Sequence, residues 1–181
     1  MTSDVRRDAI AGTGSALDAA GLDAFVREHH HRLVGLARLV CLDSSEASDA
    51  VQAALEQAWR QRETLRDAQA LRPWLDRIVV REAIRVDRRR RSPLARFFGG
   101  PREIPVGTFD HRTAAPHVSL ALRLAFEGLP ANQRAAVALH VHFGYSVAET
   151  ARLVEAPVET VRSRIRAGRE LLRHALEDER R

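Results

Sequence analysis

Apolar residues recur at helical spacing in two separate blocks of this chain, one on each side of a proline-rich stretch. The clearest pattern runs from Ala47 to Trp59, where apolar residues fall at i, i+3, i+4, i+7 and i+8. Similar spacing predicts one helix over residues 22–43 and another that begins near Arg72. The sequence lacks the alternating pattern that is typical of strands, so we expect an all-α fold.

In the second block the pattern predicts a helix-turn-helix of the winged-helix-like class. A helix over residues 130–142 should end at Gly144, because glycine readily adopts the left-handed conformation that caps helices. Ser146 and Glu149 then have the spacing of a capping box, which predicts the start of a short helix. A longer helix follows from Pro157. Its predicted inner face consists of Val158, Val161, Ile165 and Leu172.

Residues 92–117 separate the two blocks and contain four of the seven prolines, three glycines and no sustained period. Such a composition is typical of a linker. We therefore expect two small helical domains, over residues 17–91 and 118–181, joined by an extended linker. Residues 1–16 are small and polar, and we expect them to be disordered.

The net charge of +5 is unevenly distributed, and all 29 basic residues are arginines. Between residues 44 and 59 the charges are all acidic, whereas residues 72–91 carry eight arginines against three acids. Guanidinium groups bind phosphates and base edges in a forked geometry that ammonium groups lack. The basic segments therefore suit DNA, and the acidic segment suits a protein partner.

The predicted last helix has the features of a DNA-recognition helix. At 100° per residue, the side opposite Val161 carries arginine and serine, and arginine pairs bidentately with guanine in the major groove. A solvated surface helix is the alternative, but the capped short helix, the turn and the inward valines together favour the groove. The candidate DNA contacts are Glu159, Thr160, Arg162, Ser163, Arg164, Arg166 and Arg169.

A second row of arginines follows the third predicted helix. Its members recur at spacings of four, four and three, and the row continues into four consecutive arginines. Such a row favours sequence-independent phosphate binding, although four consecutive arginines also occur in solvated helix ends. The candidates are Arg77, Arg81, Arg85, Arg88, Arg89, Arg90 and Arg91.

Other chemistries find little support in the sequence. Residues 29–31 are histidines, but on a helix their side chains diverge, so we expect no metal site and no cofactor. A single cysteine, Cys41, excludes an internal disulfide, and no motif indicates an enzyme. We interpret Trp59 and Trp74 as core residues. Neither a membrane span nor the apolar run of a signal peptide is present, which predicts a cytoplasmic protein.

Taken together, the two blocks resemble the extracytoplasmic-function group of bacterial sigma-70 family sigma factors. Residues 48–60 are similar to the family's region 2.1 to 2.2 signature, and residues 71–75 with the later arginine run resemble regions 2.3 to 2.4. Residues 144–151 and 157–164 resemble region 4.2. Both blocks match in order, across a linker of suitable length.

The resemblance implies a dissociable RNA polymerase subunit without catalysis of its own. Asp49, Gln52 and Glu56 would contact the clamp helices of the polymerase β′ subunit. The first domain, with its arginine row and the loop over residues 61–70, would engage the −10 element. The second would sit on the β flap and read the −35 element. An anti-sigma factor would hold such a protein silent.

The chain departs from the family pattern at several positions. Arg81 and Arg85 stand where Asn and Asp are frequent, and Ala53 and Leu55 stand where an acid and Phe are usual. Glu155 occupies a turn position that is commonly Gly, where a left-handed conformation would cost about 1 kcal/mol. Two other hypotheses therefore stay open: an autonomous helix-turn-helix regulator, and a degenerate sigma-like adaptor.

Overall fold

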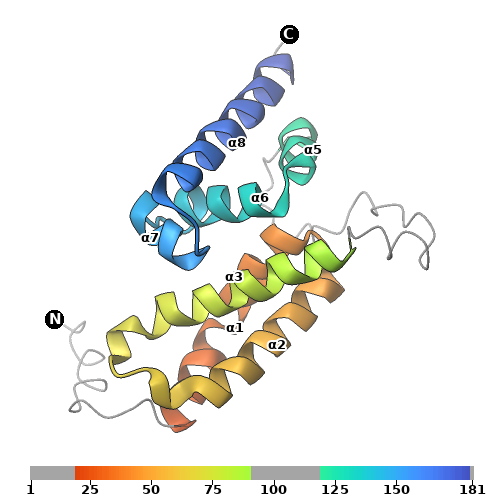
Figure 1. The fold of residues 1–181 in the computed structure, drawn as a ribbon. Helices are drawn as coiled ribbons and strands as arrows, with labels where there is room; N and C mark the ends of the chain where they lie inside the picture. The colour runs from red at the N-terminus through yellow and green to blue at the C-terminus, as the bar shows by residue number, and fades with distance from the viewer. Residues whose placement is uncertain (1–18, 91–118, 180–181) are drawn as a thin grey trace, which may run out of the picture.

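The computed structural model describes residues 19–90 and 119–179, and within these ranges every regular element is a helix (Figure 1). The predicted all-α class is confirmed. The predicted disordered segment 1–16 and the linker 92–117 lie outside the described residues. The first group consists of α1 (Ala19–Cys41), α2 (Ser44–Gln61) and α3 (Leu71–Arg90), with the 3₁₀ turns η1 (Arg62–Thr64) and η2 (Ala68–Ala70) between α2 and α3.

The second group begins with α5 (Leu120–Gly128) and α6 (Ala131–Val137). The chain continues from α6 directly into a π-helical turn, η3 (Ala138–His142). The helix-turn-helix is formed by α7 (Val147–Leu153) and α8 (Val158–Glu179). The predicted helix over residues 130–142 is therefore present, but its last turn is wider than an α-helix.

Local side-chain chemistry explains where several helices begin and end. The Asp43 carboxylate accepts a hydrogen bond from the Glu46 amide at 2.9 Å, which caps α2. Ser146 and Glu149 form both hydrogen bonds of the predicted capping box at the start of α7. Gly144 has a φ of 76°, as its predicted capping role requires. Glu155 has a φ of 49°, so this turn does place a Cβ-bearing residue in the left-handed region.

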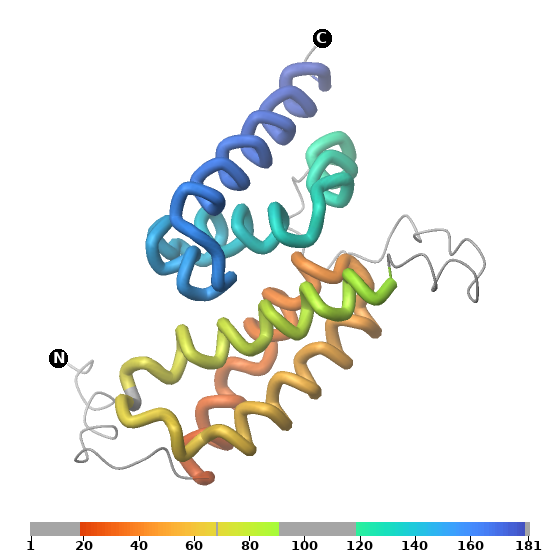
Figure 2. Tube along the Cα trace, viewed as in Figure 1, coloured from red at the N-terminus to blue at the C-terminus, as the bar shows by residue number. Residues whose placement is uncertain are grey.

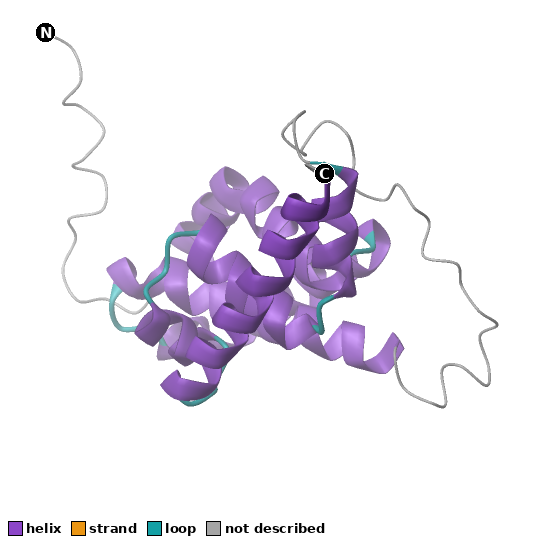
Figure 3. Ribbon diagram, turned by 90° about the horizontal axis from the view of Figure 1, so that it is seen from above, coloured by secondary structure: helices purple, strands orange, loops and turns teal. Residues whose placement is uncertain are grey.

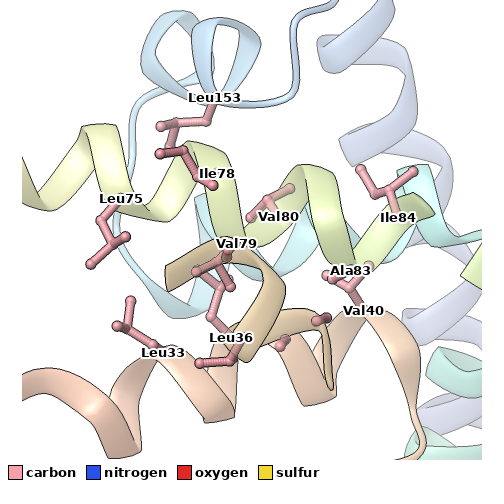
Figure 4. Packing of buried hydrophobic residues seen from close by; sticks show 14 of the residues in the cluster. Leu33, Leu36, Val40, Leu75, Ile78, Val79, Val80, Ala83, Ile84 and Leu153 are labelled. Atoms are coloured by element: carbon pink, nitrogen blue, oxygen red, sulfur yellow. The ribbon is translucent and has the colours of Figure 1, made fainter. Parts of the chain in front are cut away.

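The first group packs its three helices around one apolar core (Figure 4). Most of the stripe predicted on α2 is buried, from Ala47 to Ala58, and Leu55 within it is half-buried. Leu36 of α1 lies beside Val79 of α3 in that core, and Leu33 belongs to the same cluster. One prediction was wrong here: Trp59 is 48% exposed, because it lies beyond the end of the buried stripe, on the solvent side of the last turn of α2.

The second group has a smaller core of its own around α8. Val161 and Ile165 are buried, as predicted, and Leu172 is half-buried. Val158, by contrast, is 40% exposed, so its predicted inward position was wrong. It is the first residue of α8, directly after the turn.

The two groups also pack against each other, an arrangement that the sequence did not predict. Helices α6 and α7 lie against α3, and α6 also contacts α1 (Figures 1 and 2). Seen from above, the described chain consists of helices joined by short loops (Figure 3). Apolar residues of the second group, Leu139 and Leu153 among them, belong to the same buried cluster as the first-group core. Figure 4 shows Leu153 beside Ile78 of α3.

Replacing two helical glycines by alanine should change the stability of the protein in opposite directions. A Cβ at Gly168 would lie 2.6 Å from Cγ2 of Val137, a buried and stiff side chain, whereas a Cβ at Gly35 would meet nothing within 4 Å. We expect Gly35→Ala to raise the free energy of unfolding by about 0.5–1 kcal/mol and Gly168→Ala to lower it by about 1–3 kcal/mol. Urea unfolding followed by circular dichroism measures both. Equal effects of the two substitutions would contradict the packing of α6 against α8.

Candidate nucleic-acid interface

The outer face of α8 carries the residues that the sequence predicted for DNA contact. Glu159, Arg162, Ser163, Arg166 and Arg169 are exposed, and Thr160 and Arg164 are half-buried at the flanks. On the opposite face, Val161 and Ile165 pack on α6 and α7. The structure thus brings all seven candidates onto one helix with its buried face turned inward.

Two of these side chains already have partners on the same helix. The Arg162 guanidinium pairs with the Glu159 carboxylate one turn earlier, and both are exposed. The Ser163 hydroxyl donates to the Thr160 carbonyl at 2.9 Å. A surface pair of this kind contributes little to stability, so Arg162 can exchange Glu159 for a base edge at small cost.

On α3 the arginine row is present, but its members differ in surroundings. Arg88 and Arg89 are exposed near the end of the helix, and Arg77 is half-buried. Arg85 pairs with Glu82 on the same helix. Arg81 pairs with Glu155 of the helix-turn-helix, with 2.7 Å between Nη1 and Oε1.

The end of the row differs from the predicted continuous phosphate-binding surface. Arg90 is half-buried, and its guanidinium lies 3.4 Å from Asp87 and 3.7 Å from Glu46 of α2. This arginine therefore holds α3 to α2 rather than facing solvent. Arg91 lies outside the described residues.

The acidic candidates Asp49, Gln52 and Glu56 lie on one exposed face of α2. The Gln52 amide lies 3.5 Å from the Glu56 carboxylate, and Trp59 continues the same face one turn further on. The Arg62 guanidinium covers the Trp59 ring at 4.9 Å from its centroid. Sequence reasoning missed this aromatic residue, although its spacing from Gln52 and Glu56 indicates the shared face.

Polar contacts between the two groups centre on Arg134 of α6, which is 0% exposed. Its guanidinium donates to the Asp87 carboxylate of α3 at 2.7 Å and, through Nε, to the Val40 carbonyl of α1 at 3.0 Å. It also donates to the Leu129 carbonyl of its own group. A buried charge is tolerated only with such a full set of partners.

A second buried polar contact centres on Asp76 of α3, which is also 0% exposed. Arg32 of α1 donates to both carboxylate oxygens, at 2.7 Å for Oδ1. Tyr145 of the second group donates its phenol to Oδ2. The Phe143 ring lies 5.0 Å from the Arg32 guanidinium carbon, so two aromatic residues that follow η3 contact this ion pair.

The electrostatics of this contact follow from its burial. Desolvation, the hydrogen bond to Asp76 and the negative charge of Asp76 together raise the pKa of Tyr145 to about 12, against smaller lowering effects of Arg32 and Arg72. For Arg32, burial lowers the pKa, but the hydrogen bond and charge of Asp76 outweigh it, so the pKa is raised. Both groups therefore keep their protons through the neutral range.

Sequence reasoning did not find Arg134, Asp76 or Asp87, although one signal was available. Asp76 and Asp87 fall on the apolar stripe of α3, in register with Val79, Val80 and Ala83. A carboxylate on a buried stripe requires a cationic or hydrogen-bonding partner. The pattern could have predicted that each carboxylate forms an ion pair, but not which residue is its partner.

The remaining reactive groups form no further site among residues 19–90 and 119–179. No cluster of three metal-ligating side chains occurs there. Cys41 is buried, lies 3.4 Å from the Ala83 carbonyl, and has its pKa raised to about 12 by desolvation, with smaller effects from the charges of Glu46 and Asp87. No helix in these ranges is long and apolar enough to cross a membrane.

The fold and these surfaces define a helical DNA-binding protein with a helix-turn-helix. Comparison with known proteins identifies its family. Residues 25–92 match the family model "Sigma-70 region 2", and residues 119–172 match "Sigma-70, region 4". The chain is 37% identical over 160 residues to the ECF RNA polymerase sigma factor SigM of Mycobacterium tuberculosis, covering 88% of this chain and 79% of SigM.

A second relative is also a sigma factor. The RNA polymerase sigma-H factor of Pseudomonas aeruginosa is 29% identical over 170 residues, covering 88% of each protein.

Two solved structures share the fold. The sigma factor RpoE of Bartonella quintana, in complex with the anti-sigma factor NepR, has a TM-score of 0.68 at 24% identity, covering 86% of this chain and 98% of RpoE. CnrH, in complex with the cytosolic domain of CnrY, has a TM-score of 0.59 at 21% identity, covering 89% of this chain and 90% of CnrH. The chain belongs to the ECF group of sigma-70 family sigma factors.

The contact between the two groups can be followed through Tyr145, which is the single tyrosine of the chain. Its raised pKa means that the contact contributes stability in full below the ordinary tyrosine pKa of about 10 and loses it as the pH rises through about 12. We expect tyrosinate absorbance at 295 nm to appear with a midpoint near pH 12 in the folded protein.

The control is the same titration in concentrated guanidinium chloride, where the midpoint should fall near pH 10. In Asp76→Asn the folded-state midpoint should move part of the way towards that value, because the negative charge is lost while desolvation remains. A folded-state midpoint near pH 10 in the unsubstituted protein would show that Tyr145 is not held against Asp76.

Proposed function

We propose that this chain binds core RNA polymerase and directs it to promoters, with residues 17–91 at the −10 element and residues 118–181 at the −35 element. The observation that carries the proposal is that one chain matches the family models of both sigma-70 region 2 and region 4, in that order. A capped helix-turn-helix with arginines on the outer face of its second helix supports the −35 role. The chemistry of RNA synthesis then belongs to the polymerase.

At the −35 element, Arg162, Ser163 and Arg166 are the base-reading candidates because they are exposed near the beginning of α8. The first turns of a recognition helix enter the major groove, where arginine pairs with O6 and N7 of guanine. Arg164 and Arg169 lie nearer the flanks and would contact phosphates. Glu159 and Thr160 complete the set, and Glu159 orients Arg162 until DNA replaces it.

At the −10 element, Arg88 and Arg89 would contact phosphates from exposed positions near the end of α3. Arg81 and Arg85 are also exposed, but they pair with Glu155 and Glu82. Arg77, Arg81 and Arg85 precede Arg88 and Arg89 on α3, and the loop over residues 61–70 lies at the other end of that helix. A base held outside the duplex costs a few kcal/mol, so phosphate contacts of this kind would help to offset melting.

The polymerase contact is assigned to the exposed face of α2 that carries Asp49, Gln52 and Glu56, with Trp59 at its end. The β′ clamp is the partner that the family resemblance gives for this face, and the β flap is the partner for the second group. An anti-sigma factor is a further expected partner, supported by the solved complexes of RpoE with NepR and of CnrH with CnrY. A factor that acts on polymerase and promoter DNA works in the cytoplasm.

Transcription from genomic fragments tests the proposed function. Purified protein reconstituted with core polymerase should give discrete transcripts whose mapped 5′ ends share upstream −10 and −35 sequences. Core polymerase alone, and core with a sigma factor of known promoters, are the controls. Absence of promoter-specific transcripts, where the control sigma factor gives them, would refute the proposal.

Two arginine substitutions separate base reading from phosphate binding. We expect Arg162→Ala to weaken promoter binding by about 1–3 kcal/mol at one −35 position and to relax the preference there. Arg88→Ala should weaken all promoters alike and reduce the salt dependence of binding. Arg173→Ala, which removes an exposed arginine further along α8, is the control and should change little. Equal loss on every −35 variant for Arg162→Ala would refute its base-reading role.

A further inference from the structure

Three charged side chains lie on one face of α8 at intervals of three and four residues. They are Glu159, Arg162 and Arg166, and at 100° per residue they fall within a sector of about 60°. All three are exposed. The Glu159 carboxylate pairs with the Arg162 guanidinium, whereas Arg166 has no ion-pair partner within residues 19–90 and 119–179. Phosphate binding does not explain the acid on this face, because phosphates repel it.

The two arginines can each pair with a guanine. Their forked guanidinium groups match the O6 and N7 acceptors of guanine in the major groove. Arg166 can do so directly, whereas Arg162 first exchanges the Glu159 carboxylate for the base. Because this ion pair is exposed, the exchange costs little. It leaves the Glu159 carboxylate in the groove without its cation.

A carboxylate in this position requires an N–H donor from a base, since phosphate oxygens only accept hydrogen bonds. An acceptor that leaves water without gaining a donor weakens the complex. Guanine and thymine offer only acceptors in the major groove, apart from the thymine methyl group, and adenine places its N6 donor beside the N7 acceptor. Cytosine presents the N4 donor with no neighbouring acceptor. Cytosine is therefore the base that suits Glu159.

The spacing of the three residues matches successive base pairs. Neighbours in the set are about 4.5 Å and 6 Å apart along the axis of α8, and base pairs stack about 3.4 Å apart. The groove winds around the DNA axis, so the path from one base edge to the next along the groove is longer than the stacking distance. In zinc fingers, helix side chains at intervals of three residues contact three successive bases in this way.

We propose that Glu159, Arg162 and Arg166 read three successive base pairs of the −35 element, through cytosine, guanine and guanine respectively. The element therefore contains three adjacent G·C base pairs, and Glu159 is a specificity-determining residue. This base reading rests on the proposed function, because it requires α8 to lie in the major groove of the −35 element.

A simpler role for Glu159 is to hold Arg162 and to stabilise the first turn of α8, where acids interact favourably with the helix dipole. The two roles affect different base pairs. Loss of an orienting carboxylate relaxes the preference at the base pair that Arg162 reads, whereas loss of a base contact relaxes it one base pair away. A matched ion pair lies near the end of α8, where the Arg173 guanidinium is 3.8 Å from the Glu177 carboxylate and both are exposed.

Competition binding by the reconstituted holoenzyme tests the proposal on a promoter whose transcript 5′ end has been mapped. The DNA set contains every single base-pair substitution across the −35 element, at one salt concentration. For the unsubstituted chain we expect three adjacent G·C pairs at which a substitution lowers the affinity by about tenfold. Arg162→Ala should relax the preference at the middle pair, and Arg166→Ala and Glu159→Ala should each relax it at one flanking pair.

Glu159→Gln gives the sharpest result, because a glutamine amide pairs with N6 and N7 of adenine. At its base pair the preference should change from cytosine to adenine, while the two guanine preferences stay. Glu177→Gln replaces the matched exposed acid of the same helix and should change the preference at no position. Circular dichroism of the free variants should show unchanged helix content, since both side chains are exposed.

The outcomes separate this base reading from the proposed function. A −35 element without three adjacent G·C pairs would overturn the base reading and leave a promoter-specific factor. The same holds if Glu159→Ala and Glu159→Gln change the preference only at the base pair that Arg162 reads, or at none. Failure of the holoenzyme to select any promoter, where a control sigma factor does, would overturn the proposed function and the base reading with it.

Discussion

The placement of the two helical groups depends on the buried guanidinium of Arg134. A charge with 0% exposure needs partners on every donor edge, and here they come from α1, α3 and the turn before α6. These partners fix α6 against the first group. Once α6 is fixed, α7 lies over α3, Tyr145 reaches Asp76, and the turn before α8 meets Arg81. The recognition face of α8 is left exposed.

Local signals in the sequence were sufficient for the helices and for the exposed faces of α8 and α2 that carry the candidate residues. The capping box at Ser146 and the apolar stripe of α2 act within a few residues, so they can be recognised without the fold. Trp59 and Val158 were misplaced because both lie at helix ends, where periodicity no longer shows which neighbour covers a side chain. The contact of Arg134 with Asp87 joins residues far apart in sequence, and no local pattern names its partner.

In the folded chain, the acidic and basic segments lie on different surfaces. Helix α2 lies on the side of the first group away from α7 and α8 (Figure 1), and its candidate residues Asp49, Gln52 and Glu56 are exposed. The arginines of α3 are divided: Arg81 faces the helix-turn-helix, whereas Arg88 and Arg89 face solvent.

The most direct test of a promoter-specificity factor is a footprint on one promoter, made with the free chain and again with core polymerase. We expect protection of the −10 and −35 elements together when polymerase is present, and no protected site with the free chain at the same concentration. Protection of a specific site by the free chain alone would contradict this account and would instead identify an autonomous helix-turn-helix regulator.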